Sequence, residues 1–262
     1  MYRSIAITTL ILSAAAFAWA DDGSTFQWQG EMQPGQTLAI RGVNGGVTAD
    51  LAPGALASVT AVKTVPGDDP SIVRIQVVPG DGGVTVCAVY PGFQTSADHP
   101  CGGQGSDVTV TGILVAFTVH VPAGVALDAT TVNGDVRASG LTGSVRAVTV
   151  SGQIALTVDG PAQANTVNGS IVAVLGKVDW TGTRAFATVN GSIDATIPAS
   201  ADVVVHASTV TGAISTGFPL VVNGWSGFSC GVPPTLNGTL GLGGRGLDLA
   251  TVNGSIHLRK SQ

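Results

Sequence analysis

The sequence predicts an all-β protein, in which a β-solenoid of stacked coils follows a less regular region of β-sheet and hairpins. The first observation is a hexapeptide that recurs with a period of about 20 residues, as expected for a solenoid or array. The second is composition: 37 Gly and 13 Pro occur, and no convincing amphipathic helix follows the first twenty residues. The third is that Glu31 is the only glutamate among 16 acidic residues, and aspartate favours turns.

The first element, residues 1–20, has the pattern of a secretory signal peptide. Arg3 precedes an apolar run over residues 5–17, and Ala18-Trp19-Ala20 forms a small-residue cleavage site. An uncleaved membrane anchor is the alternative, but the run is shorter than the roughly 20 residues that span a bilayer. We therefore expect a periplasmic or secreted protein that starts at Asp21 and has no transmembrane segment after cleavage.

The second element, residues 21–122, is predicted to be a β-sheet region continuous with the solenoid. Residues 72–78 alternate in polarity, residues 79–83 are rich in turn formers, and residues 84–90 return as a second strand, which indicates a hairpin. Residues 115–121 alternate in the same way. We expect this region to cap the solenoid, whose end strands would otherwise expose unpaired edges.

Three cysteines in an oxidising compartment predict one disulfide and one unpaired thiol. Cys87 and Cys101 are the better pair, because the first belongs to a strand and the second closes the polar loop that follows it. Cys230 is then left over in a segment rich in Gly and Pro, and the sequence assigns it no role.

The third element, residues 123–262, contains the repeats. The hexapeptides are Thr131-Val-Asn-Gly-Asp-Val136, Thr149-Val-Ser-Gly-Gln-Ile154, Thr166-Val-Asn-Gly-Ser-Ile171, Thr188-Val-Asn-Gly-Ser-Ile193, Thr209-Val-Thr-Gly-Ala-Ile214 and Thr251-Val-Asn-Gly-Ser-Ile256. Their starts are 18, 17, 22, 21 and 42 residues apart, and the last spacing is twice 21. The expected turn positions are Asn133, Gly134, Ser151, Gly152, Asn168, Gly169, Asn190, Gly191, Thr211, Gly212, Asn253 and Gly254.

Two geometries are compatible with this hexapeptide. Asn-Gly readily adopts the positive φ angles of a tight turn, so the chain can either reverse in a hairpin or turn a corner. A near-constant period with identical side chains favours corners of coils that stack in register. We expect the flanking Val and Ile side chains to point inward and the asparagine amides to hydrogen-bond along a column.

Longer motifs extend over almost the whole chain. They are Phe26-x-Trp28, Pro34-Gly, Val43-Asn-Gly, Val84-Thr-Val-Cys-Ala-Val-Tyr-Pro91, Phe117-Thr-Val-His-Val-Pro122-Ala-Gly, Gly241-Leu-Gly-Gly and Leu247-Asp-Leu-Ala-Thr-Val-Asn-Gly-Ser-Ile256. From about Phe26 to Lys260 the chain resembles the bacterial "putative adhesin" family of exported β-solenoid domains. The resemblance implies a solenoid fold and an adhesin-like role.

No catalytic, metal or cofactor site is expected. A glycan-cleaving β-helix needs paired carboxylates on adjacent coils, but Asp135 and Asp194 do not recur at the equivalent positions of other repeats. The four histidines are far apart and lack metal-ligand spacing. Residues 243–248 resemble one copy of a calcium-binding nonapeptide, which needs several tandem copies.

Aromatic side chains are the candidate recognition surface. Trp180, Trp225 and Phe228 lie where the regular repeat is interrupted, so they either contact a partner or fill the irregular coils. Nucleic acid is not an expected partner, because without Arg3 the chain has 10 basic and 16 acidic residues, a charge of −6, and the basic residues are scattered.

These observations favour a non-enzymatic structural or adhesin-like protein of the cell envelope or exterior. Its expected partners are a surface polysaccharide, an envelope protein or a second copy of itself. A carbohydrate-binding module for cell-wall glycan is the alternative, and a polysaccharide-active β-helix enzyme is the third hypothesis.

Overall fold

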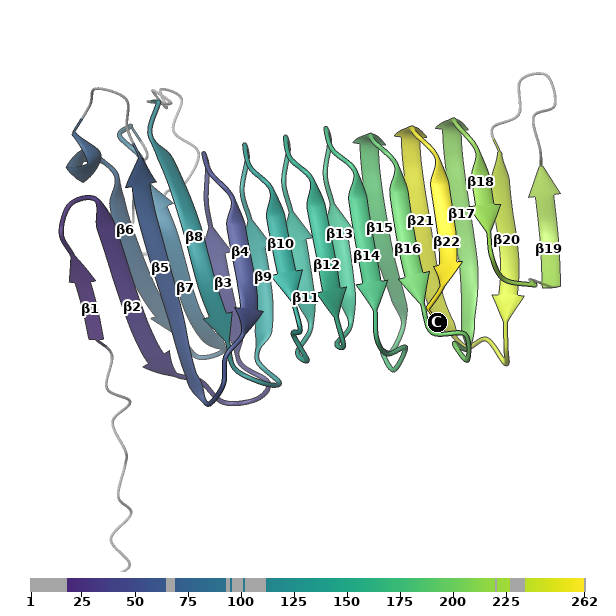
Figure 1. Ribbon diagram of the computed structural model, residues 1–262, viewed down its shortest axis with the longest axis horizontal. Coiled ribbons are helices and arrows are strands. Elements are labelled where there is room, and N and C mark those ends of the chain that lie inside the picture. Colours follow the sequence, from purple (N-terminus) through teal and green to yellow (C-terminus); the bar gives the residue numbers. More distant parts are fainter. Residues whose placement is uncertain are drawn as a thin grey trace, which may run out of the picture.

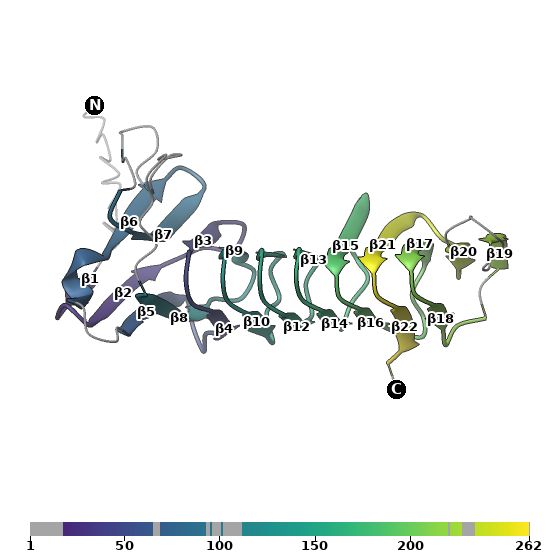
Figure 2. The ribbon, with the colours of Figure 1, turned by 90° about the horizontal axis from the view of Figure 1, so that it is seen from above.

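The computed structural model describes residues 18–64, 69–92, 95, 101, 112–219, 221–226 and 234–261 of the 262. This part of the chain is all-β apart from a short 3-10 helix, η1 (Pro70–Ile72). Two eleven-stranded sheets face each other along an elongated body (Figures 1 and 2). No helix in the described residues has the length and apolarity needed to cross a membrane.

Each sheet combines strands from the whole length of the chain. Sheet A contains, in spatial order, β1 (Ala18–Asp21), β2 (Thr25–Glu31), β5 (Leu56–Thr64), β8 (Leu114–Val121), β4 (Val47–Leu51), β10 (Val136–Ser139), β12 (Ile154–Val158), β14 (Ile171–Leu175), β16 (Ile193–Ile197), β22 (Ile256–Lys260) and β18 (Ile214–Thr216). Sheet B contains β6 (Arg74–Gly80), β7 (Gly83–Val89), β3 (Thr37–Arg41), β9 (Ala126–Thr130), β11 (Val145–Val148), β13 (Ala162–Asn165), β15 (Thr183–Asn190), β21 (Arg245–Asn253), β17 (Val203–Thr211), β20 (Thr235–Leu240) and β19 (Val221–Ser226).

Between β9 and β16, consecutive strands alternate between the two sheets. Each strand pairs in parallel with the next strand of its own sheet, as β9 does with β11 and β10 with β12. Along each strand every second side chain points into the space between the sheets, where Ile154, Ile171 and Ile193 occupy one row and are fully buried. The core is therefore a set of apolar rows that run along the body.

The spatial order of the strand pairs differs from their order in the chain. The last pair, β21–β22, lies between β15–β16 and β17–β18 and is parallel to both (Figure 1). The 42-residue spacing therefore does not mark a coil missing from a linear series, because the final hexapeptide stacks between the fourth and fifth. At the other end, β3–β4 lie between β7–β8 and β9–β10.

Antiparallel strands extend both sheets at one end of the body and sheet B alone at the other. The predicted hairpin is present as β6 and β7, and β5, β2 and β1 continue sheet A beyond β8. At the C-terminal side, β20 and β19 extend sheet B beyond β17. The expected signal-peptide cleavage point, before Asp21, falls within β1, and residues 1–17 lie outside the described residues.

The disulfide between Cys87 and Cys101 that the sequence predicts is present in the structure. Cys87 lies in β7 and is buried. Closing a loop of this length stabilises the fold by about 3 kcal/mol in the chain-entropy model. Cys230 lies outside the described residues.

Next to this disulfide-bonded strand, the buried Tyr90 predicts a loss of stability at alkaline pH. Its hydroxyl lies 3.2 Å from the carbonyl oxygen of Asn44 and 3.1 Å from that of Ile113, and burial raises its pKa. An unfolded tyrosine ionises near pH 10, so above that pH the unfolded state releases its proton before the folded state does. We expect the free energy of unfolding to fall there by up to about 1.4 kcal/mol per pH unit until the folded tyrosine also ionises.

This effect is measured as the difference between wild type and Tyr90→Phe in denaturant unfolding from pH 8 to pH 11. The substitution should lower stability at pH 8 and flatten the alkaline decline. The same alkaline decline in both proteins would show that Tyr90 is not its source.

Candidate functional site

The hexapeptides form the corners at which the chain passes from sheet B to sheet A, on the edge seen from above in Figure 2. Within each corner the threonine side chain points inward, is almost fully buried and donates a hydrogen bond to a glycine carbonyl of the neighbouring corner. These bonds, 2.8–3.1 Å long, join Thr131 to Gly45, Thr149 to Gly134, Thr166 to Gly152, Thr188 to Gly169, Thr251 to Gly191 and Thr209 to Gly254. These hydrogen bonds therefore join each corner to the next one, in the spatial order of the strands.

The glycines of the corners are required by close approach of the neighbouring backbone. A Cβ atom on Gly152 would lie under 3.0 Å from the carbonyl oxygen of Gly134, and one on Gly191 would meet Gly169 in the same way. Gly134, Gly152, Gly191 and Gly254 have no positive φ, whereas Gly169 and Gly212 do, at 159° and 155°; no asparagine among the described residues has one. The expected positive φ angles therefore occur at two of the six corner glycines and at none of the corner asparagines. The chain turns gradually, and the glycine lets the next corner stack on it.

The valine that follows each threonine points outward, which also corrects the sequence prediction. The side chains of these valines are 38–50% exposed; they are Val132, Val150, Val167, Val189, Val252 and Val210. The pattern Thr-Val does not show which of the two side chains points inward, because both residues are β-branched. In the structure the threonine points inward, because its hydroxyl can donate a hydrogen bond to the adjacent glycine carbonyl. The last residue of the hexapeptide points inward as predicted, and Ile154 is fully buried.

A polar ladder lies beside the valines. It consists of Asn44, Asn133, Ser151, Asn168, Asn190, Asn253 and Thr211, which are paired in register. The Asn190 amide donates to Asn168 and the Asn253 amide donates to Asn190, both at 2.8 Å, and Asn133 donates to Asn44 at 2.9 Å. We call the exposed valines and this ladder together the corner array. Its units repeat at the inter-strand spacing of about 4.8 Å.

The hydrogen bonds of the buried corner threonines predict a measurable loss of stability in Thr188→Val. Valine has the same shape but no hydroxyl, so the Gly169 carbonyl loses the hydrogen bond that Thr188 donates at 2.8 Å. Losing this hydrogen bond and leaving its acceptor without a partner costs about 1–2 kcal/mol. Urea unfolding should show this decrease, whereas Val189→Thr, one position along and exposed, should change stability by less than about 0.5 kcal/mol. Equal unfolding midpoints for the two variants would contradict a stabilising role for the threonine hydrogen bonds.

Of the aromatic residues proposed as a recognition surface, Trp180 does not belong to an exposed surface. Its side chain is 2% exposed, and the indole Nε1 donates to the carbonyl oxygen of Gly246 at 3.2 Å. Trp180 belongs to the loop between β14 and β15 and packs into the hydrophobic core. Trp225 belongs to β19, but its side chain and all of Phe228 lie outside the described residues.

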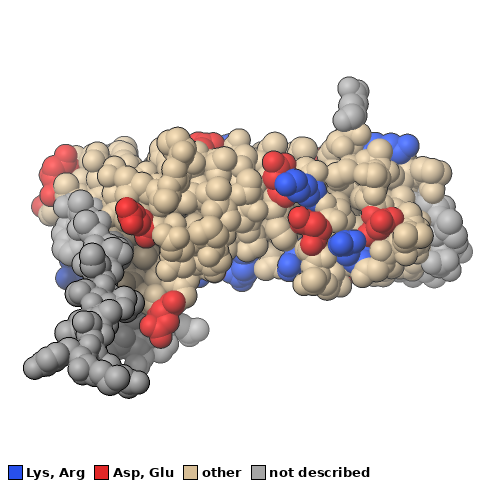
Figure 3. Space-filling view, turned by 90° about the horizontal axis from the view of Figure 1, so that it is seen from below, with Lys and Arg blue, Asp and Glu red and all other residues tan. Residues whose placement is uncertain are grey.

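On the opposite edge, where the chain passes from sheet A back to sheet B, the described connections do not repeat such a pair of side chains. Figure 3 shows it mostly uncharged, with a few acidic and basic side chains interspersed. Lys177, Asp179, Asp202 and Arg245 line one shallow depression there. Neither sign of charge dominates this edge.

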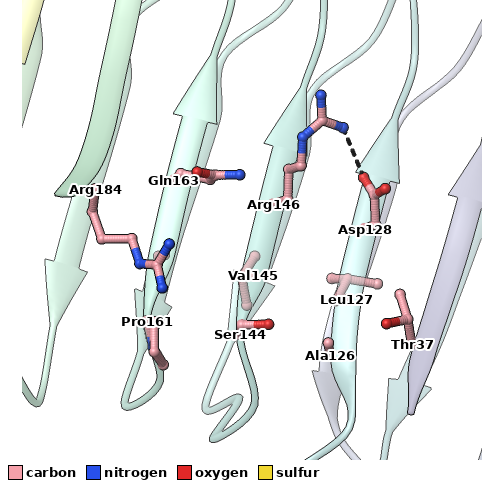
Figure 4. Close-up of a pocket in the computed structure, with 11 residues that line it drawn as sticks. Thr37, Ala126, Leu127, Asp128, Ser144, Val145, Arg146, Pro161, Gln163 and Arg184 are labelled. Atoms are coloured by element: carbon pink, nitrogen blue, oxygen red, sulfur yellow. Dashed lines mark hydrogen bonds and ion pairs between the residues drawn. The ribbon is translucent and has the colours of Figure 1, made fainter. Parts of the chain in front are cut away.

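A groove of about 270 Å³ lies on sheet B, near the beginning of β9, β11 and β13 (Figure 4). Asp128, Arg146 and Gln163 lie in one row across these strands, and Arg184 of β15 enters the groove from the side. Asp128 accepts a hydrogen bond from Arg146 at 3.0 Å and another from Arg41 at 2.6 Å. We call this feature the sheet B groove.

The sheet B groove is not predictable from the sequence. Its residues are isolated in the chain, and only the register of the sheet brings them together. One local feature of the sequence points to an unusual arginine. Side chains two residues apart share a face of a strand, so Arg184 lies in the same inward-facing row as Phe186 and Thr188.

Comparison with known proteins reveals only distant similarity. No family model matches the chain, and no curated protein matches it. Similar solved structures include a "putative cell adhesion protein" from Clostridium sporogenes, with 12% identity and a TM-score of 0.47 over 90% of this chain and 99% of that chain. A "putative adhesin" from Bacteroides fragilis has 8% identity and a TM-score of 0.27 over 90% and 97%. At these identities and TM-scores the similarities carry no argument about function.

Proposed function

We propose that this chain is an exported, non-enzymatic β-solenoid with a structural or adhesin-like role, which binds an extended surface polymer, an envelope protein or a second copy of itself. The single observation that supports this proposal best is the corner array. It presents the same pair of side chains, one apolar and one polar, on successive strand pairs along one edge of the body.

The chemistry of the array suits an extended partner. Each exposed valine offers an apolar contact, and the adjacent amide or hydroxyl offers hydrogen bonds, so many weak contacts add along the edge. Hydrogen bonds along the ladder hold the amides in fixed orientations before any partner arrives, which lowers the entropy cost of binding. An array at about 4.8 Å spacing matches a partner with its own short repeat, such as a β-strand stack or a polysaccharide.

The array is tested by placing a charge at its centre. Val167→Lys should weaken binding at least ten-fold, because a lysine interrupts the apolar row without disturbing the buried side of the corner. The matched control is Val204→Lys, since Val204 is also exposed, at 46% against 40% for Val167, but lies on the outer face of sheet B. Binding is measured by co-sedimentation with purified peptidoglycan and cell-surface polysaccharide, and self-association by analytical ultracentrifugation.

The outcomes separate the alternatives. Loss of binding or of self-association in Val167→Lys alone would support the corner array as the contact surface. An equal effect of both lysine variants would place the contact elsewhere. A wild-type chain that stays monomeric and binds none of these polymers would overturn the proposed function.

A further inference from the structure

Sheet B opens beside the groove, between the beginnings of β13 and β15. These two strands are paired only at Ala164 with Phe186 and at Asn165 with Ala187, whereas β15 pairs with β21 from Thr183 onward. The preceding residues of β13 and β15 are therefore not joined in the ladder. Arg184 lies at this opening, and Figure 4 shows its guanidinium turned toward Pro161 of the neighbouring strand connection.

Arg184 is an arginine whose hydrogen-bonding capacity is unused. Arg184 is partly buried, and its Nε atom is buried without a hydrogen-bond partner among the described residues. It forms no ion pair within the described part of the chain either, whereas Arg146 is paired with Asp128. A buried guanidinium N–H without a partner is unfavourable, and such groups usually have a structural or binding explanation.

The charges of the groove favour a negatively charged ligand. Two guanidinium groups, those of Arg146 and Arg184, share the groove with one carboxylate, Asp128. That carboxylate is already engaged by Arg41 from the other side, so it does not neutralise Arg184. The groove is thus locally positive on a chain whose formal net charge is −5.

We propose that the sheet B groove binds a carboxylate-bearing sugar unit of an acidic polysaccharide. Arg184 donates to the carboxylate, because the planar guanidinium matches a carboxylate with two parallel hydrogen bonds. Arg146, which Asp128 holds in place on the next strand but one, donates to a hydroxyl group of the neighbouring unit. The neutral polar side chains of Ser144 and Gln163, which also line the groove, contact neighbouring hydroxyl groups. A volume of about 270 Å³ suits one small unit, and the open groove lets the polymer continue on both sides. This site is separate from the corner array and does not depend on it.

The test is calorimetric titration of the full chain with oligogalacturonate, and with the same oligomer after methyl esterification, which removes the charge but keeps the sugar. The wild type should bind only the charged oligomer, and more weakly as salt rises. Arg184→Gln should weaken binding at least ten-fold. Arg137→Gln should leave binding unchanged, because Arg137 belongs to β10 of sheet A and does not line the groove.

A second variant and free anions complete the test. Arg146→Gln should also weaken binding, and it leaves Asp128 paired with Arg41, so the site is tested even when Arg184→Gln does not fold. Equal binding of the esterified oligomer, or unchanged binding in both groove variants, would overturn the proposal. Inorganic phosphate or acetate that binds as tightly as the oligomer would overturn the assignment to a polysaccharide.

Discussion

Removal of residues 245–262 is expected to unfold the C-terminal third of the body rather than shorten it. The deletion takes away β21 and β22, which lie between β15–β16 and β17–β18 and are hydrogen-bonded to both pairs. It also removes the fully buried side chains Leu247, Leu249, Ile256 and Leu258. At about 1.5–3 kcal/mol for each buried side chain, their loss amounts to roughly 6–12 kcal/mol. That is comparable with the whole stability of a typical domain, about 5–15 kcal/mol.

The measurement is thermal unfolding followed by circular dichroism, together with limited proteolysis of the truncated chain. We expect a large fall in the midpoint and rapid cleavage after β16. A chain that ends at Lys260 is the control, because it keeps both strands and should behave like the wild type. A truncated chain with an unchanged cooperative transition would mean that β17–β18 can close directly onto β15–β16, and it would contradict this prediction.

The second large effect is expected from a single methyl group, in Gly152→Ala. The added Cβ would meet the backbone of Gly134 and Asp135 in the adjacent corner, and backbone atoms cannot move aside as a flexible side chain can. The two corners would have to separate, which would break the hydrogen bond that Thr149 donates to the Gly134 carbonyl. We expect a loss of about 3 kcal/mol, at the upper end of the usual cost of overpacking.

Gly54→Ala is the matched control, since a Cβ on Gly54 has no atom within 4 Å and its φ is not positive. Chemical denaturation measures the free energy of unfolding of the wild type, Gly152→Ala and Gly54→Ala. A Gly152→Ala protein as stable as Gly54→Ala would show that the corners can separate without cost, and that the glycine is not needed for stacking.

The all-β class was predictable from the sequence. This was possible because the hexapeptide combines β-branched residues with a small polar pair, and its period brings equivalent residues into register. The pairing of Cys87 with Cys101 was also predictable, since one cysteine belongs to a strand and the other closes the loop after it. These are local properties of the chain.

The stacking order and the groove were not predictable in this way. The fourth and last hexapeptides are identical in six positions, and the fifth differs only slightly, so their sequences do not say which of them are neighbours. Thr188 points inward and Val189 outward because a glycine carbonyl of another corner accepts the hydrogen bond of the threonine. Arg146 and Arg184 line the same groove only because sheet B places β11, β13 and β15 side by side. Each of these depends on a contact between distant segments.

Because β21–β22 lie between strand pairs that precede them in the chain, folding cannot finish in the order of synthesis. The pairs from β9–β10 to β15–β16 can add one after another as the chain emerges, but β17–β18 has no native neighbour among them. Until residues 245–260 arrive, β16 keeps an exposed edge, and β17–β18 can pair with it in a non-native register. Such long-range closure slows folding and leaves strand edges open to other chains. Refolding of the complete chain should therefore end with a slow step in which the last strand pair inserts and displaces these premature contacts.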